Sequence, residues 1–247
     1  MEEVTEITFL SMASMEDVKE YFNELPQQLE EFLDADYDRG FKHLLSTLYQ
    51  FFDIVDTVNV QAKEGKRINE NEATEIGNHG FVVLLKLSDL MEKLDLPHKR
   101  KEIEQISLVF ARWVIRFNGK LHHLEPIVNA FAQAANTIQE RESLTALANL
   151  LNLIVAACAD PIKHDLNSSS LYRPWRLLHI NRCIIATRTH NLEIMKRAFD
   201  EILLYLPKDA KSFFKEGMKE MVEKNYPQHV RDLMQHYHQS RPSMSVH

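Results

Sequence analysis

The feature that most constrains the fold is an apolar stripe of helical period in the first quarter of the chain. Between residues 38 and 62, apolar side chains recur at intervals of three and four, which places them on one wide face of a single long helix. They are Phe41, Leu44, Leu45, Leu48, Phe51, Phe52, Val55 and Val58. The pattern predicts an amphipathic helix that buries this face.

The same period recurs along most of the chain. It predicts further helices over residues 14–25, 26–33, 69–94, 98–118, 124–139, 142–159, 174–190, 191–206, 208–224 and 227–239. No segment shows the alternation typical of a strand, and glycine and proline are scarce, with 6 and 8 residues. Because short links between long helices favour antiparallel neighbours, we predict an all-α fold of stacked antiparallel helical hairpins. A helical bundle or a short α-solenoid of about ten helices satisfies that prediction.

The last 65 residues carry features of a helical repeat. Phe199 and Pro207 lie where the second helix of one repeat would end, and Phe213 and Gly217 occupy the aromatic and small positions of the next. In these features the segment, about a quarter of the chain, resembles tetratricopeptide-type hairpins. It departs from them at Met195 and His229, which stand at small-residue positions, and it lacks the opening Trp-x-x-Leu-Gly pattern. The resemblance implies only an architecture of helix pairs stacked side by side.

Charge divides the chain unevenly. Residues 1–38 hold twelve acidic side chains and one lysine, whereas the whole chain has a net charge of −7. We expect residues 1–38 to form an acidic helical arm that folds back, mimics an acidic partner or keeps the protein soluble. The remaining boundaries are predicted as a helical bundle over residues 39–160, a polar loop or joint over 161–174 and C-terminal helical hairpins over 175–247.

The cellular compartment is predicted from three absences. The acidic N-terminus has no secretory signal pattern, and no apolar run approaches the roughly 18 residues of a membrane span. Cys158 and Cys183 lie in apolar runs without a paired motif, which is typical of buried thiols in a reducing compartment. We expect a soluble, cytoplasmic protein with no membrane association.

The segment over residues 173–190 mixes four arginines with apolar residues. On a helical projection the arginines do not gather on one face, which argues against a helix that tracks nucleic-acid phosphates. Arg182 falls on the apolar side beside Trp175, so it needs a partner. Glu142, Asp160 and Asp200 are candidate internal partners, and an anionic ligand or partner carboxylate is the functional alternative, with Trp175 and Arg176 as candidate contacts.

A second group of basic residues lies at the C-terminal end of the helix predicted over 98–118 and in the turn that follows it. The spacing of four places Arg112, Arg116 and Lys120 on one helical face, and His122 and His123 follow at the turn. This basic patch is a candidate site for a phosphate, an acidic partner or the chain's own acidic arm. The alternative is a solvated helix end, where cations suit the helix dipole.

Catalytic sequence motifs are absent. The chain has no glycine-rich phosphate loop, no GxSxG, no HExxH and no EF-hand loop. The spacings do not match a di-iron site, and His229, Asp232 and His236, which align on one helix face and could hold a zinc ion, are expected to be exposed to solvent instead. We therefore expect no metal ion and no cofactor. Enzymatic activity stays open, with the balance against it, because active sites also assemble from distant residues.

Three functions follow as hypotheses. The leading one is a non-enzymatic scaffold or adaptor that binds a peptide or helix of a partner protein in a groove between helices. The second is a helical ligand-binding protein or enzyme with a site around Arg182 and the loop over residues 160–174. The third is a nucleic-acid or regulator-binding factor that uses the basic patch over residues 112–123. Wide apolar helix faces also favour a homodimer.

Overall fold

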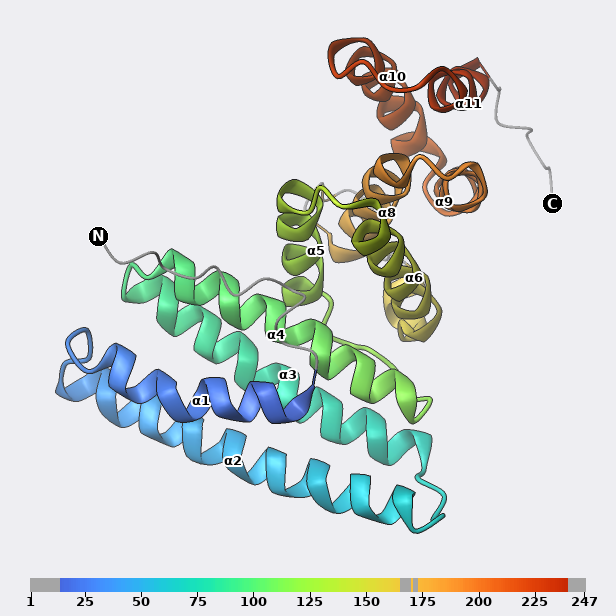
Figure 1. Cartoon of the computed structure of the whole chain (residues 1–247). Helices are drawn as coiled ribbons and strands as arrows, with labels where there is room; N and C mark the ends of the chain where they lie inside the picture. Colours follow the sequence, from blue (N-terminus) through green and yellow to red (C-terminus); the bar gives the residue numbers. More distant parts are fainter. Residues whose placement is uncertain (1–13, 165–169, 171–172, 240–247) are drawn as a thin grey trace. The chain divides into compact units, whose positions relative to one another are not determined.

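The computed structural model describes residues 14–164, 170 and 173–239. These residues form eleven α-helices, and the only β-type pairing among them is an isolated bridge between Leu121 and Cys158. The predicted all-α fold of packed helices is confirmed (Figure 1). None of the described helices is long and apolar enough to span a membrane.

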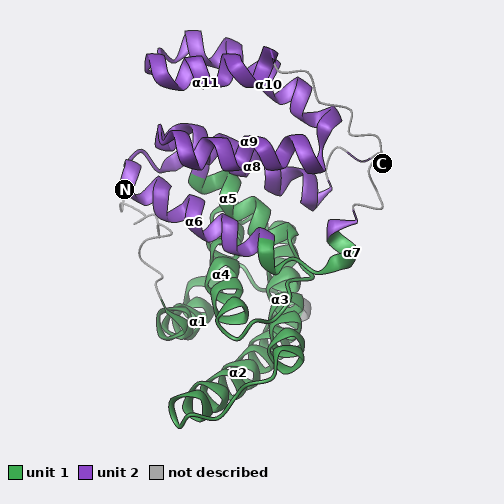
Figure 2. Ribbon diagram, turned by 90° about the vertical axis from the view of Figure 1, so that its right-hand side faces the viewer, with its two compact units in different colours: residues 1–134, 156–162 green, residues 135–155, 163–247 purple. Residues whose placement is uncertain are grey.

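The chain divides into two compact units, drawn in different colours in Figure 2. Unit 1 comprises residues 1–134 and 156–162, and unit 2 comprises residues 135–155 and 163–247. The chain therefore crosses between the units within α5 (Glu125–Thr137), near the end of α6 (Arg141–Ala157) and at the end of the short α7 (Asp160–Lys163). The last crossing lies within the predicted joint over residues 161–174, much of which lies outside the described residues.

Unit 1 is built around four helices. They are α1 (Met15–Leu29), α2 (Ala35–Lys63), α3 (Glu70–Lys93) and α4 (Pro97–Arg116). Each one packs on its neighbours in chain order, and α1 also packs on α4, so the four close into a bundle (Figure 1). The stripe that predicted the α2 helix is inside this bundle, since Phe41, Leu48, Phe51 and Val55 are almost fully buried.

The sequence predicted two helices in the region of α1, one of them beginning at Pro26, but the structure has one helix that runs through Pro26. A proline inside a helix cannot donate to the carbonyl four residues earlier, here that of Phe22. The Tyr49 hydroxyl of α2 donates to the Phe22 carbonyl at 3.1 Å instead. A side chain of a neighbouring helix thus supplies the hydrogen bond that Pro26 removes.

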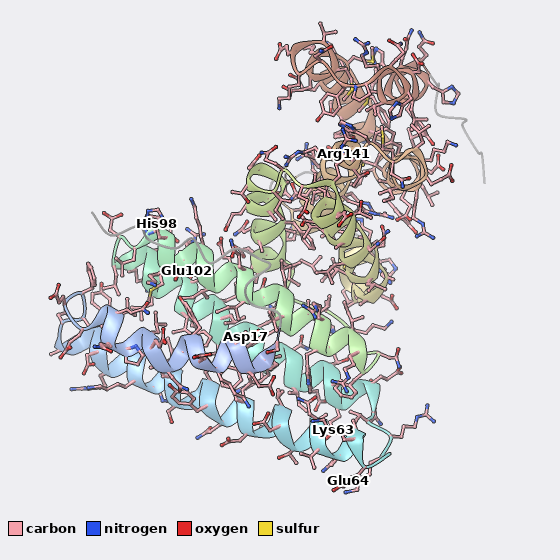
Figure 3. All side chains as sticks on the ribbon, in the orientation of Figure 1. Asp17, Lys63, Glu64, His98, Glu102 and Arg141 are labelled. Carbon is pink, nitrogen blue, oxygen red and sulfur yellow. The ribbon has the colours of Figure 1, made fainter. Side chains whose placement is uncertain are left out.

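The acidic segment near the N-terminus is part of the bundle over the residues that the structure describes. Ser14 caps α1: the backbone N–H of Asp17 donates to its hydroxyl at 3.2 Å, and its own N–H donates to the Asp17 carboxylate at 2.8 Å. The Tyr21 hydroxyl donates to the buried Glu102 carboxylate of α4 at 3.0 Å, and Lys99 pairs with the same carboxylate at 2.8 Å (Figure 3). These contacts fix α1 against α4.

Two glycines of α3 allow the closest helix packing in unit 1. A Cβ atom at Gly80 would lie 2.7 Å from the Phe51 ring and 2.8 Å from the Phe110 ring. A Cβ atom at Gly77 would lie 2.2 Å from a methyl group of Val114. Because the two rings stack at a centroid distance of 4.7 Å, the bare backbone of α3 forms part of the aromatic core.

Unit 2 is dominated by two helical hairpins. They consist of α8 (Pro174–Thr189) with α9 (Leu192–Tyr205), and of α10 (Pro207–Glu223) with α11 (Gln228–Gln239). The partners of each hairpin pack side by side (Figure 2), and α9 also packs on α10 and α11. The helix α9 therefore joins the two hairpins.

Tight turns separate the helices of unit 2. The left-handed residue His190 ends α8, and the side chain of Asn191 accepts from the N–H groups of Glu193 and Ile194 to cap α9. Pro207 opens α10 at the first helical position, where its missing N–H costs no hydrogen bond.

Candidate functional site

Unit 2 contains a groove of about 980 Å³ along α8 and α10. One wall is the face of α8 that begins at Arg176, and the other is the face of α10 that begins at Ser212. At one end Arg173 and Arg176 both donate to the Asp209 carboxylate, at 3.0 Å and 2.6 Å. At the other end the rings of His190 and Tyr226 lie 5.3 Å apart. The start of α8 thus contacts the start of α10, and the residues that follow the two helices also contact each other. The two helices therefore run in the same direction.

The middle of the groove is apolar. It is lined by Leu144, Ile180, Ile184, Phe213, Met221 and Met234. Ile184 is 38% exposed although it is a large apolar side chain, and Met221 and Met234 form the deeper, buried part. Gly217 also lines the groove, and a Cβ atom there would lie 2.8 Å from the sulfur of Met234. An apolar ligand would cover side chains that are now in contact with water.

The end of the groove near the last turns of α8 and α10 is cationic. Arg141, Arg188, Lys224 and His190 line it, together with Tyr226. Burial and the neighbouring charge of Arg141 both lower the pKa of His190. Burial raises the pKa of Tyr226, whereas the charges of Lys224 and Arg188 act in the opposite direction. Both rings therefore lie in a positive electrostatic field.

Arg182, the arginine singled out from the sequence, is almost fully buried away from water. Its guanidinium makes an ion pair with Glu201 of α9, with a second contact of 2.9 Å between Nη2 and Oε1. Its Nε donates to the Asn152 side chain at 2.8 Å. The internal partner is thus Glu201 rather than Glu142, Asp160 or Asp200. All three guanidinium nitrogens are engaged, and Arg182 does not line the groove.

Trp175 and Arg176, the other residues predicted near Arg182, lie at the start of α8. Trp175 is buried, and its ring packs against His179 at 4.4 Å and Tyr205 at 5.8 Å. Arg176 lines the groove while it is paired with Asp209. Of these candidates, only Arg176 belongs to the groove.

His179 is a buried group that the sequence did not single out. It is fully inaccessible to water, and neither ring nitrogen has a hydrogen-bond partner. Burial, with a smaller contribution from the charge of Arg182, lowers its pKa to about 4. The ring is therefore neutral at physiological pH and acts as part of the core between Trp175 and Tyr205.

The predicted basic patch lies on unit 1. Arg112, Arg116 and Lys120 are exposed, and within the described part of the chain none of them pairs with a carboxylate. The Arg116 guanidinium lies 5.2 Å from the Phe117 ring centroid. His122 is exposed, whereas His123 is half-buried near Phe81 and its pKa is lowered by burial. The five residues surround one helix end, and binding of an anion there stays a prediction.

The groove combines residues that sequence reasoning treated separately. On α8, Arg176 and Arg188 lie about 120° apart around the helix axis, and Ile180 and Ile184 fall between them. The arginines looked scattered because they lie at the two edges of one face that has an apolar centre. Arg141 was missed because it belongs to another helix, and no local pattern links residue 141 to residues 188–190.

The chemistry of the groove follows from the side chains that line it. In the described ranges no three histidine, cysteine or carboxylate side chains gather in a way that could hold a metal ion. The groove offers an apolar centre, arginines at both ends and one histidine. In comparisons with protein-family models, curated proteins and solved structures, no match to this chain was found.

Proposed function

We propose that the protein is an interaction module whose groove between α8 and α10 binds an amphipathic helix of a partner protein. The observation that carries the proposal is the partly exposed apolar centre of the groove beside one cationic end, which is lined by Arg141 and Arg188. Apolar anchors on one face of a helix would fill the space above Ile180 and Ile184. The arginines at the cationic end would then select a partner with an acidic residue beside its apolar anchors.

The dimensions of the groove favour a short helix. Its α8 wall extends from Arg176 to Arg188, which corresponds to about 18 Å at 1.5 Å per residue. A partner helix of about twelve residues has the same length. The volume of about 980 Å³ lies near the upper end of the range for ligand sites, which suits a row of apolar side chains better than one small molecule.

The setting of this function is proposed to be the cytoplasm. Cys158 and Cys183 are buried free thiols, which is consistent with a reducing compartment. A homodimer, which the apolar helix faces of the sequence favoured, stays a prediction.

The proposal is tested by selection from a random peptide library displayed on its encoding RNA, with the full chain as bait. We expect enriched peptides with apolar residues at intervals of three and four and with acidic residues at one end. Their affinity is then measured by fluorescence anisotropy. Ile184→Lys should weaken binding by about tenfold or more, because it places a charge in the apolar centre of the groove.

Matched controls separate the groove from other exposed apolar residues. Ile54 of α2 is 45% exposed and Leu204 of α9 is 70% exposed, and neither lines the groove. Ile54→Lys and Leu204→Lys should leave the affinity unchanged. Enriched peptides that bind Ile184→Lys as well as the natural chain, or a selection that enriches no helical pattern, would overturn the proposal.

A further inference from the structure

The charges that line the groove do not cancel. Arg176 is paired with Asp209, Glu216 with Lys219 and Glu220 with Lys224. Two guanidinium groups remain, those of Arg141 and Arg188, and neither has a carboxylate partner within the described residues. Both lie at the same end of the groove. This end therefore holds two positive charges that the protein does not neutralise.

The position of Arg141 gives no stabilisation to its own helix. It is the first residue of α6, where the helix dipole favours acidic side chains and disfavours cations (Figure 3). Its sequence neighbours Glu140 and Glu142 do not line the groove, and the Glu140 carboxylate accepts from Ser143 at 2.6 Å. Arg188 differs, since it lies in the last turn of α8, where a cation suits the dipole.

Two nitrogens at this end also lack partners. Nη2 of Arg188 donates to the Ile138 carbonyl at 2.6 Å and to the Gln139 side chain at 3.1 Å, which holds the guanidinium in place. Its Nη1 is buried and makes no hydrogen bond, and the same holds for Nδ1 of His190. An unsatisfied buried donor on a charged group is costly, and an acceptor that reached Nη1 after a small movement of the Arg188 side chain would relieve that cost.

We propose that the end of the groove formed by Arg141, Arg188 and His190 binds the phosphate of a phosphorylated serine or threonine on the partner helix. This inference rests on the proposed function of the groove and names the chemistry of one end of its ligand. A phosphate dianion balances two guanidinium charges, whereas a carboxylate balances one. Its three oxygens also supply acceptors for both guanidinium groups at once.

The inference is tested with synthetic amphipathic helices of about twelve residues. Each helix is made in three versions, with serine, glutamate or phosphoserine at one end or at the other, and is titrated against the full chain by anisotropy. We expect the phosphoserine version to bind at least about tenfold more tightly than the serine version, with glutamate between them. Arg141→Gln should weaken binding of the phosphoserine version by at least about tenfold and binding of the serine version by much less, so that the preference between them is lost.

The controls separate the failure of this inference from the failure of the groove proposal. Arg141 is exposed, so its replacement leaves the core intact, and an unchanged circular dichroism spectrum verifies that the variant is folded. Arg112→Gln, an exposed arginine of unit 1, should keep the preference. Equal binding of all three versions would overturn the phosphate site but not the groove. Binding of none of them to the natural chain would contradict both.

Discussion

Two classes of arginine distinguish the core of unit 2 from its groove. Arg182 is buried and its charge is matched by Glu201, so it stabilises the packing of α8 on α9. Arg141 and Arg188 lack such a carboxylate and line an open surface. Sequence reasoning correctly required a partner for Arg182, because a buried charge needs one. It could not identify Glu201, since that pairing depends on how α8 and α9 pack.

The ion pair of Arg182 gives the first prediction. Glu201→Gln leaves a buried guanidinium without its carboxylate and should destabilise unit 2 by about 2 kcal/mol. Urea denaturation followed by circular dichroism measures the change. Glu193→Gln, which removes an exposed carboxylate at the start of α9, serves as the control. A denaturation midpoint equal to that of the natural chain would show that the pair is not stabilising.

His179 predicts a dependence of stability on pH. Its pKa is about 4 in the folded protein and about 6.5 in an unfolded chain, so the unfolded chain binds a proton first as pH falls. The free energy of unfolding is therefore unaffected by this group above pH 6.5. As the pH falls towards 4, the free energy of unfolding decreases by up to about 3 kcal/mol.

This dependence can be measured by urea denaturation between pH 7 and pH 4. His179→Leu should reduce the slope of the free energy of unfolding against pH in this range, whereas replacement of the exposed His98 by glutamine should not. Trp175 packs on His179 and Trp113 lies in unit 1, so 5-fluorotryptophan labelling reports on the two units separately. An equal effect of acid on both signals, unchanged in His179→Leu, would contradict the prediction.

At the scale of the element, most helices of the structure follow from the sequence. The apolar period and the caps placed α2, α3, α4 and the helices of unit 2 within a few residues of their observed bounds. The exceptions are α1, because proline was taken as a helix start, and the four-residue α7, which lies at the start of the predicted loop. The hydrogen bond that Pro26 removes from α1 is replaced by one from a hydroxyl of α2. This is a tertiary contact, which a local sequence pattern does not reveal.

The Tyr49 hydroxyl provides the test of that explanation. Tyr49→Phe removes the donor to the Phe22 carbonyl and retains the ring, so it should destabilise unit 1 by about 1 kcal/mol. The loss should disappear when Pro26 is also replaced by alanine, since the backbone can then donate to Phe22 itself. A double-mutant cycle in urea measures this coupling, and two additive effects would refute it.

Gly80 predicts the effect of filling a close contact. Gly80→Ala gains about 1 kcal/mol of helix propensity, but its methyl group would overlap the stacked rings of Phe51 and Phe110. Overpacking costs about 1–3 kcal/mol, so we expect a net loss of stability. Gly40→Ala is the control, because nothing lies within 4 Å of a Cβ atom there. Thermal unfolding of the two variants should shift in opposite directions, and stabilisation by Gly80→Ala would contradict the packing.

At the scale of the whole molecule, one of the three crossings between the two units lies within the predicted joint over residues 161–174, and the other two were not evident from composition. The chain crosses between them inside α5 and α6, where the helical pattern continues without a change in charge or in turn residues. The candidate site was only partly predictable for the same reason. The groove collects residues from four separate stretches between residues 135 and 234, and only Arg176 among the predicted site residues lies in it.

The most direct test of the groove is nuclear magnetic resonance of the chain labelled at its methionine methyl groups. Met221 and Met234 line the groove, whereas Met15 and Met91 are in the core of unit 1. When a library-selected helical peptide is added, the signals of Met221 and Met234 should shift and saturate together, while those of Met15 and Met91 stay unchanged. Shifts confined to the methionines of unit 1, or none at saturating peptide, would contradict the assignment of the groove as the binding site.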